Sequence, residues 1–209
     1  MESKDIPRWL EWAREIQALA QTGKHYAENE YQVERYQRLL QISAEIIEQH
    51  SELDDEELVR IFTRQVGYAT PRVDVRGVVF QNGELLMVRE RMDNGWTMPG
   101  GWADVGDFPS EAVEREVFEE SGYRVKVQRM VGIYDANRFG TLEVFHAYKI
   151  VFLCNIIGGE ARTSNETTEV AFFSLNEIPE PLSAERTPLR VISHAFAAYG
   201  DEHWQVVFD

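Results

Sequence analysis

The first third of the chain carries apolar residues at helical spacing. Near the N-terminus they recur every three or four positions, which predicts a helix whose buried face is formed by Trp9, Trp12, Ile16 and Leu19. A second helix is expected over residues 28–49, with an apolar stripe formed by Tyr36, Leu39, Leu40, Ile46 and Ile47. Asp54 and Glu57 match a capping box, so a short third helix should follow, with its buried face formed by Leu58, Ile61 and Phe62.

The pattern changes to that of β-structure from Val73 onward. The runs VDVRGVVF and ELLMVRE are separated by Gln81, Asn82 and Gly83, which predicts a β-hairpin. A turn at residues 93–95 leads into the sequence TMPGG, and Pro109 should begin a helix because proline is favoured at the first helical position. Further strands are expected over residues 124–135, 144–155 and 169–174, and a last helix over residues 187–199.

These elements predict an α/β protein with a mixed sheet and two parts. The first is a helical N-terminal extension of residues 1–66, and the second is a domain of residues 70–209. Three short helices make a poor independent core, so their apolar faces should pack against the larger domain or against another subunit. We therefore expect a homodimer.

Composition narrows the possible partners. The 209 residues are 44% hydrophobic and 27% charged, typical of a soluble globular protein, and the formal net charge is −15. That charge disfavours extended nucleic-acid binding and adhesion to anionic membranes, but it allows a small anion site where metal ions reverse the local charge. The single cysteine, Cys154, lies in the apolar run KIVFLCNII, where a buried thiol is expected. Without a disulfide partner, a signal-peptide pattern or a membrane-length apolar run, a soluble cytoplasmic protein is expected.

The most informative stretch is GWADVGDFPSEAVEREVFEESGY, residues 101–123. In its helical part Glu116, Glu119 and Glu120 stand three and four positions apart, so their carboxylates share one face and repel one another. A hard divalent cation such as Mg²⁺ or Mn²⁺ removes that conflict because it prefers oxygen ligands. Arg115 can hold a carboxylate at the start of this cluster. Gly100 and Gly101 permit close approach of the backbone, as a phosphate-bearing ligand requires.

This stretch resembles the Nudix box. The positions that match in identity and spacing are Gly101, Arg115, Glu116, Val117, Glu119, Glu120 and Gly122. Asp107 stands where the box has its first glutamate, a residue that mainly braces the arginine, and Asp104 or Glu111 could share that task. The resemblance implies a Nudix-type α/β/α sandwich and a metal-dependent pyrophosphohydrolase. It implies that Glu116 and Glu120 bind Mg²⁺, or Mn²⁺ in its place, with Glu119 as a further ligand.

The resemblance extends to the N-terminal helices, which are similar to those of a bacterial Nudix subgroup. That subgroup implies a substrate in which a nucleoside diphosphate is joined to a second group, of the CDP-choline or ADP-ribose type, with CDP-choline favoured. The products would be a nucleoside monophosphate and a phosphorylated second group. Glu119 and Arg115 are expected in the catalytic group, with Glu169 as the general base and Glu166 as the second choice. A polar surface loop remains the alternative for these last two acids.

Substrate contacts are less specific. Arg76, Arg89 and Arg91, with Arg72, flank the first hairpin and could reach the phosphates, although for each one taken alone a solvated surface charge is the more common role. Trp96 and Trp102 bracket the PGG turn and could stack on a base or be buried. Two alternatives to a small-molecule pyrophosphohydrolase stay open: an RNA 3′-end nuclease with the same metal site, and a catalytically silent nucleotide sensor.

Overall fold

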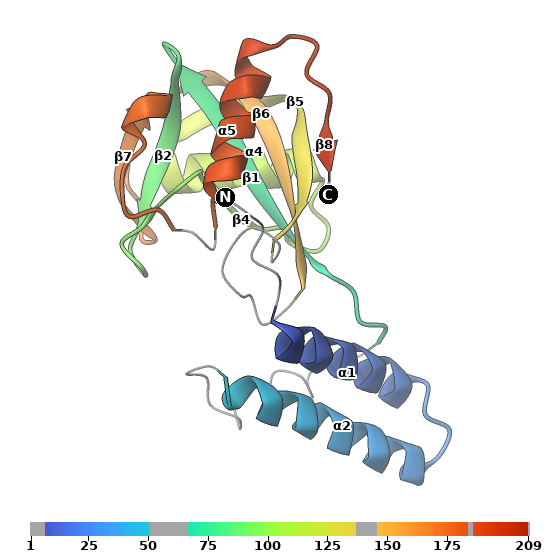
Figure 1. Ribbon diagram of the computed structural model, residues 1–209. Coiled ribbons are helices and arrows are strands. Elements are labelled where there is room, and N and C mark those ends of the chain that lie inside the picture. The colour runs from blue at the N-terminus through green and yellow to red at the C-terminus, as the bar shows by residue number, and fades with distance from the viewer. Residues whose placement is uncertain (1–6, 51–66, 137–145, 184–185, 209) are drawn as a thin grey trace. The chain divides into compact units, whose positions relative to one another are not determined.

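The computed structural model describes residues 7–50, 67–136, 146–183 and 186–208 (Figure 1). The chain forms two compact units, an N-terminal helical unit and an α/β unit that begins at Arg72. His146 groups with the N-terminal unit. The predicted helix at Asp54–Phe62 lies outside the described residues.

The N-terminal unit contains two antiparallel helices, α1 (Arg8–His25) and α2 (Glu30–Glu48), which lie side by side (Figure 1). Asn29 caps α2, since its side chain accepts a hydrogen bond from the backbone N–H of Gln32 at 3.0 Å. Leu40 and Ile47 are buried as predicted, whereas Leu39 is exposed at the rim of the predicted stripe.

The prediction of the buried face of α1 is wrong, because the observed face is displaced from it by about one position along the sequence. Trp12 and Leu19 are 53% and 63% exposed, and the buried residues are instead Leu10, Ala13, Gln17, Ala20 and Gln21. Small alanines allow α2 to approach closely, and the Ser43 hydroxyl donates to the carbonyl of Ala13 at 2.7 Å. The two buried glutamines bond to each other at 2.7 Å. Trp12 and Leu19 therefore lie outside this buried face, whereas Trp9 packs against the core of the helix pair and stacks on His50.

The α/β unit is built on one mixed sheet. Its strands are β1 (Arg72–Gln81), β2 (Glu84–Glu90), β3 (Trp96–Thr97), β4 (Gly100–Trp102), β5 (Tyr123–Asp135), β6 (Ala147–Gly159), β7 (Thr167–Phe173) and β8 (Val207–Phe208). Along the sheet the order is β3-β2-β1-β6-β5-β8, with β4 paired to β1 and β7 paired to β2. β1 and β6 are parallel, whereas β5 and β6 are antiparallel. The predicted hairpin is present, with Asn82 and Gly83 at positive φ between β1 and β2.

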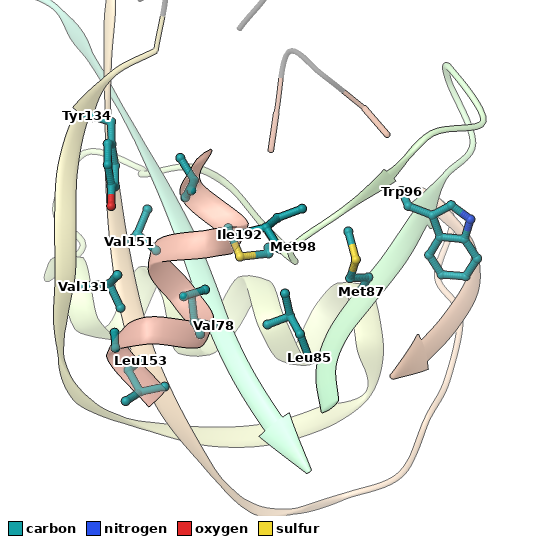
Figure 2. Close-up of a cluster of buried hydrophobic side chains, with 13 residues drawn as sticks. Val78, Leu85, Met87, Trp96, Met98, Val131, Tyr134, Val151, Leu153 and Ile192 are labelled. Carbon is teal, nitrogen blue, oxygen red and sulfur yellow. The ribbon is translucent and has the colours of Figure 1, made fainter. Parts of the chain in front are cut away.

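Helices α4 (Pro109–Ser121) and α5 (Leu189–Gly200) lie on opposite faces of this sheet (Figure 1). Alternate strand residues face each helix: Val78 of β1 belongs to the core under α5, whereas Val75 and Val79 pack with α4. Figure 2 shows the α5 side, where Ile192 packs among strand residues such as Val151 and Leu153. Cys154 is buried on the α4 side, as predicted, and burial raises its thiol pKa to about 12. The mixed α/β fold with a helical N-terminal part is thus confirmed.

Candidate functional site

Helix α4 carries the acidic cluster and is anchored at both ends as predicted. Pro109 occupies its first turn, and Gly122 ends it in the left-handed conformation with φ 79°. Ala112, Val113 and Val117 bury one face of α4 against the sheet. The glutamates of the neighbouring face therefore line a cavity of about 650 Å³, a volume suited to a small-molecule ligand.

Glu120 is the most deeply placed of the three glutamates, with only 4% of its surface exposed. Its Oε2 accepts a hydrogen bond at 2.9 Å from the backbone N–H of Gly100. Burial raises the pKa of Glu120 to about 7, which means that the fold disfavours its charged form. Burial and the charge of Glu119 also raise the pKa of Glu116, although Arg115 opposes them.

The two glycines of the PGG turn are required by the protein's own packing. Gly100 has φ 146°, and a side chain there would collide with the carbonyl of Val75 in β1. A Cβ at Gly101 would come within 2.9 Å of Oε2 of Glu116. Both glycines line the cavity, and the Gly100 N–H is already bonded to Glu120.

Arg115 joins the acidic cluster to the loop that precedes α4. It donates to Asp107 at 2.9 Å and to Glu116 at 2.7 Å, and it lies 3.4 Å from Glu119 and 3.5 Å from Asp104. The hydrogen bond that Arg115 donates to Asp107 is the main reason that the pKa of Arg115 lies above its ordinary value. Asp107 thus makes the bracing contact expected at the first acidic position, and Asp104 adds a second, longer one.

The carboxylates on α4 are ligands that suit a hard cation, but their oxygens are not gathered around one point. Within the described ranges, no three histidine, cysteine, aspartate or glutamate side chains are arranged as a metal centre. Glu116 and Glu119 instead accept hydrogen bonds from the guanidinium of Arg115. Carboxylate oxygens are nevertheless the ligands that Mg²⁺ prefers, and because burial raises the pKa of Glu120, a bound cation would stabilise its charged form.

On the strand side of the cavity, Asp74, Arg76 and Lys149 form a buried ionic group. Of these three residues, the sequence analysis singled out Arg76. Arg76 of β1 holds Asp74 with two hydrogen bonds of 2.8 and 2.6 Å, and its remaining contact is the Met98 carbonyl at 3.3 Å. Lys149 of β6 stands opposite Asp74 in the parallel register, with its Nζ 3.8 Å from the carboxylate. Burial opposes the charge of Arg76, but Asp74 outweighs it and raises its pKa. The sequence signal for this group was the presence of charged residues in the apolar runs that form β1 and β6.

The other predicted contact residues lie outside the cavity lining. Arg89 bonds to Glu169 at 2.6 Å, and Arg91 donates to the carbonyl of Asn165 at 2.9 Å. Glu169 lies within β7, where it pairs with Arg89 in the register. Glu166 lines the cavity together with Ser164 and Asn165.

The two tryptophans around the PGG turn separate. Trp96 is buried in the core on the α5 side (Figure 2). Its ring packs edge-on against that of Phe173. Trp102 lines the cavity, and the Arg72 guanidinium lies over its ring at 5.8 Å. Of these two aromatic side chains, Trp102 is the one available to a ligand.

Comparison with known families agrees with this geometry. Residues 70–195 match the NUDIX domain model, and residues 7–62 match a model described as the UDP-X-like, N-terminal oligomerisation domain. The chain is 36% identical over 203 residues to the Bacillus subtilis protein YjhB, named provisionally as an ADP-ribose pyrophosphatase, and the match covers 97% of each chain.

Two solved structures are also similar. One is an ADP-ribose pyrophosphatase from Streptococcus suis, with 36% identity, a TM-score of 0.62, and coverage of 67% of this chain and 100% of that one. The other is a UDP-X diphosphatase, with 29% identity, a TM-score of 0.63, and coverage of 96% of this chain and 98% of that one. The second likeness extends over both units.

Proposed function

This chain belongs to the Nudix hydrolase family, and on that premise we propose that it cleaves the diphosphate of a nucleoside diphosphate joined to a second group. The products are a nucleoside monophosphate and a phosphorylated second group. The observation that carries the proposal is the buried Glu120 beside the Gly100 N–H, in a cavity that also contains Glu116, Arg76 and Lys149. Acidic groups on one side suit a cation, and cationic groups on the other suit a diphosphate.

Glu116, Glu119 and Glu120 are the residues that would hold a divalent cation, with Mg²⁺ preferred and Mn²⁺ as a substitute. Nudix hydrolases generally use such ions. A bound cation supplies Lewis acidity at the phosphoryl oxygens and lowers the pKa of bound water. Arg115 positions Glu116 and Glu119 through its contacts with Asp107 and the cluster.

The remaining roles follow from position. The general base is an acid of the loop or strand after β6, and Glu166 is placed better than Glu169 because it lines the cavity. The alternative, Glu169, requires its ion pair with Arg89 to open. Gly100 and Gly101 contact the substrate at the cavity wall. Arg76, predicted as a further contact, is buried and held by Asp74, and Arg89 and Arg91 reach the substrate only after leaving their present partners.

The substrate is of the ADP-ribose or UDP-linked type. The relatives that cover most of this chain are named for those two classes, and the helical N-terminal unit matches the family model of the second class. Trp102 offers a partly exposed aromatic face in the cavity, on which a base or a sugar can stack. CDP-choline remains a related candidate because the same diphosphate is cleaved.

We further propose that the protein is a cytoplasmic homodimer joined through its N-terminal units. The support is the match to an oligomerisation domain and the exposure of Trp12 and Leu19 on α1. Light scattering tests this: a dimer mass for the wild type and a monomer mass for Trp12→Ala/Leu19→Ala are expected, and a wild-type monomer at micromolar concentration would refute it. Among the described helices, none is both long and apolar enough to cross a membrane.

The reaction is tested with a hydrolysis panel. ADP-ribose, UDP-glucose, CDP-choline, NADH and a short RNA are each incubated with and without Mg²⁺ or Mn²⁺, and the products are identified by chromatography. Cation-dependent release of AMP, UMP or CMP supports the proposal and identifies the substrate class. Trimming of the RNA alone would favour the nuclease, and inactivity throughout would favour a nucleotide sensor.

A further inference from the structure

We propose that Arg186 binds a phosphoryl oxygen of the substrate diphosphate, and that Lys149 positions it. This inference rests on the proposed hydrolase function and assigns an anion-binding residue to the same cavity. Arg186 follows β7 and precedes α5, far in sequence from the acidic cluster on α4, yet it lines the same cavity as Glu116 and Glu120.

The four cationic side chains of the described cavity lining differ in their availability. Arg76 and Lys149 are almost fully buried, and Arg115 is surrounded by carboxylates. The Arg186 side chain is 26% exposed, and its hydrogen bond to a described residue is from Nη1 to Oε1 of Glu90, at 3.0 Å. A guanidinium has five N–H donors in a planar fork, so Arg186 can hold Glu90 and still present donors to a phosphate.

The backbone around Arg186 is held by buried polar contacts. The Thr187 hydroxyl contacts the Thr97 hydroxyl at 2.7 Å and accepts the Met98 N–H at 3.1 Å. On the other side, the Ser183 N–H donates to the Trp96 carbonyl at 2.9 Å. Ser183 and Thr187 therefore lie beside the strand that leads into the PGG turn. A charged group held in this way needs little reorganisation when an anion binds.

Lys149 adds a third attachment point. Its Nζ donates to the backbone carbonyl of Arg186 at 3.0 Å while facing Asp74 at 3.8 Å. Lys149 stands opposite Asp74 in the β1–β6 register, so the position of Arg186 is tied to the centre of the sheet. We assign Lys149 a positioning role rather than direct contact with the substrate, because it is nearly buried.

Glu90 distinguishes substrate binding from a purely structural ion pair. It is 2% exposed, lies behind the cavity lining, and has a raised pKa caused by burial, so its charge is weakly stabilised. If Arg186 serves only to neutralise Glu90, removing either partner should have the same effect. If Arg186 binds phosphate, Glu90→Gln releases the guanidinium toward the ligand, whereas Arg186→Gln removes it. Arg186→Gln then weakens binding, and Glu90→Gln does not.

The test measures the affinity of inorganic pyrophosphate by calorimetry in the presence of Mg²⁺ and that of ADP-ribose by calorimetry without a divalent cation, together with ADP-ribose hydrolysis in the presence of Mg²⁺. Arg186→Gln should weaken both affinities about tenfold to a hundredfold, because a charge-assisted hydrogen bond is lost. Arg186→Lys should lie between, since it keeps the charge and loses the fork. Glu90→Gln should bind as tightly as the wild type or more tightly. Arg124→Gln, which removes an exposed guanidinium on β5, is the matched control and should change neither affinity.

Unchanged affinity in Arg186→Gln, equal weakening in Glu90→Gln, or no pyrophosphate binding by the wild type would each overturn the inference. Lys149→Met should raise the KM for ADP-ribose with a smaller change in kcat, and an unaltered KM would remove its positioning role. Pyrophosphate binding that depends on Arg186 without hydrolysis of any panel compound would refute the proposed function and leave the anion site in place.

Discussion

Two groups of charged side chains face the same cavity and differ in how their charges are compensated. On α4, Glu116 and Glu119 share Arg115, while burial raises the pKa of Glu120 to about 7. On the strands, Asp74 is held by two hydrogen bonds from Arg76, with Lys149 at 3.8 Å. Negative charge on α4 therefore calls for a cation from solution, whereas the strand group is compensated within the protein. Substitutions on α4 should affect chemistry, and substitutions on the strands should affect folding.

The largest expected effect is that of Glu120→Gln, which separates a loss of activity from a loss of stability. Glu120→Gln should lower kcat for the panel substrate by on the order of 10³-fold or more, because a proposed cation ligand is lost. The same variant should unfold at an equal or higher temperature without metal, since the amide removes a buried charge that the fold disfavours. Added Mg²⁺ should raise the unfolding temperature of the wild type and leave that of the variant unchanged.

The matched control for this prediction is Glu114→Gln. Glu114 lies on the same helix, but its carboxylate bonds to Lys126 and to the backbone N–H of Val127 in β5. The Glu114→Gln variant should retain nearly full activity. Near-normal activity in both Glu116→Gln and Glu120→Gln would mean that α4 is not the cation site.

On the strand side the next largest effect is on stability. Asp74→Asn should reduce the free energy of unfolding by about 3–5 kcal/mol, because Arg76 loses its carboxylate while remaining buried. Chemical denaturation measures this loss. The double substitution Asp74→Asn/Arg76→Met should recover part of it, since no unpaired guanidinium remains. A single variant within about 1 kcal/mol of the wild type would contradict a charge-compensated strand group.

The α4 cluster could be predicted from the sequence and the strand group largely could not, for a physical reason. Glu116 and Glu120 lie one helical turn apart, so their spacing alone places them on one face. Asp74 and Lys149 lie 75 positions apart, and only the parallel register of β1 and β6 brings them together. Arg186 meets Glu90 through contacts across 96 positions, which no local pattern encodes.

The error on α1 shows a second limit. Periodicity correctly indicated a helix, but the largest apolar residues, including Trp12 and Leu19, were assumed to form its buried face. The helix pair instead buries Ala13, Ala20 and a bonded pair of glutamines, because small side chains allow the backbones to approach. Glu169 illustrates the same limit in a strand, where its pairing with Arg89 depends on the β2–β7 register.

A smaller effect is expected at Thr187, whose contacts hold the backbone next to Arg186. Thr187→Val removes a buried hydroxyl that contacts Thr97 and Met98, and it should cost about 1–2 kcal/mol of stability. It should also raise the KM for ADP-ribose more than it lowers kcat, because the segment bearing Arg186 loosens. Ser193→Ala on α5 is the control, since its hydroxyl bonds only within its own helix, to Leu189. Equal KM changes in both variants would remove the link between Thr187 and Arg186.

The smallest effect concerns Asp107, which takes the first acidic position of the box. Asp107→Asn should cost about 0.5 kcal/mol and reduce kcat only a few-fold, because the contact with Arg115 is partly exposed and Glu116 also holds that guanidinium. Asp107→Glu should restore kcat if bracing is the whole role. Thermal unfolding and steady-state kinetics measure both. A loss as large as that of Glu120→Gln would place Asp107 among the cation ligands and extend the uncompensated acidic group from α4 into the preceding loop.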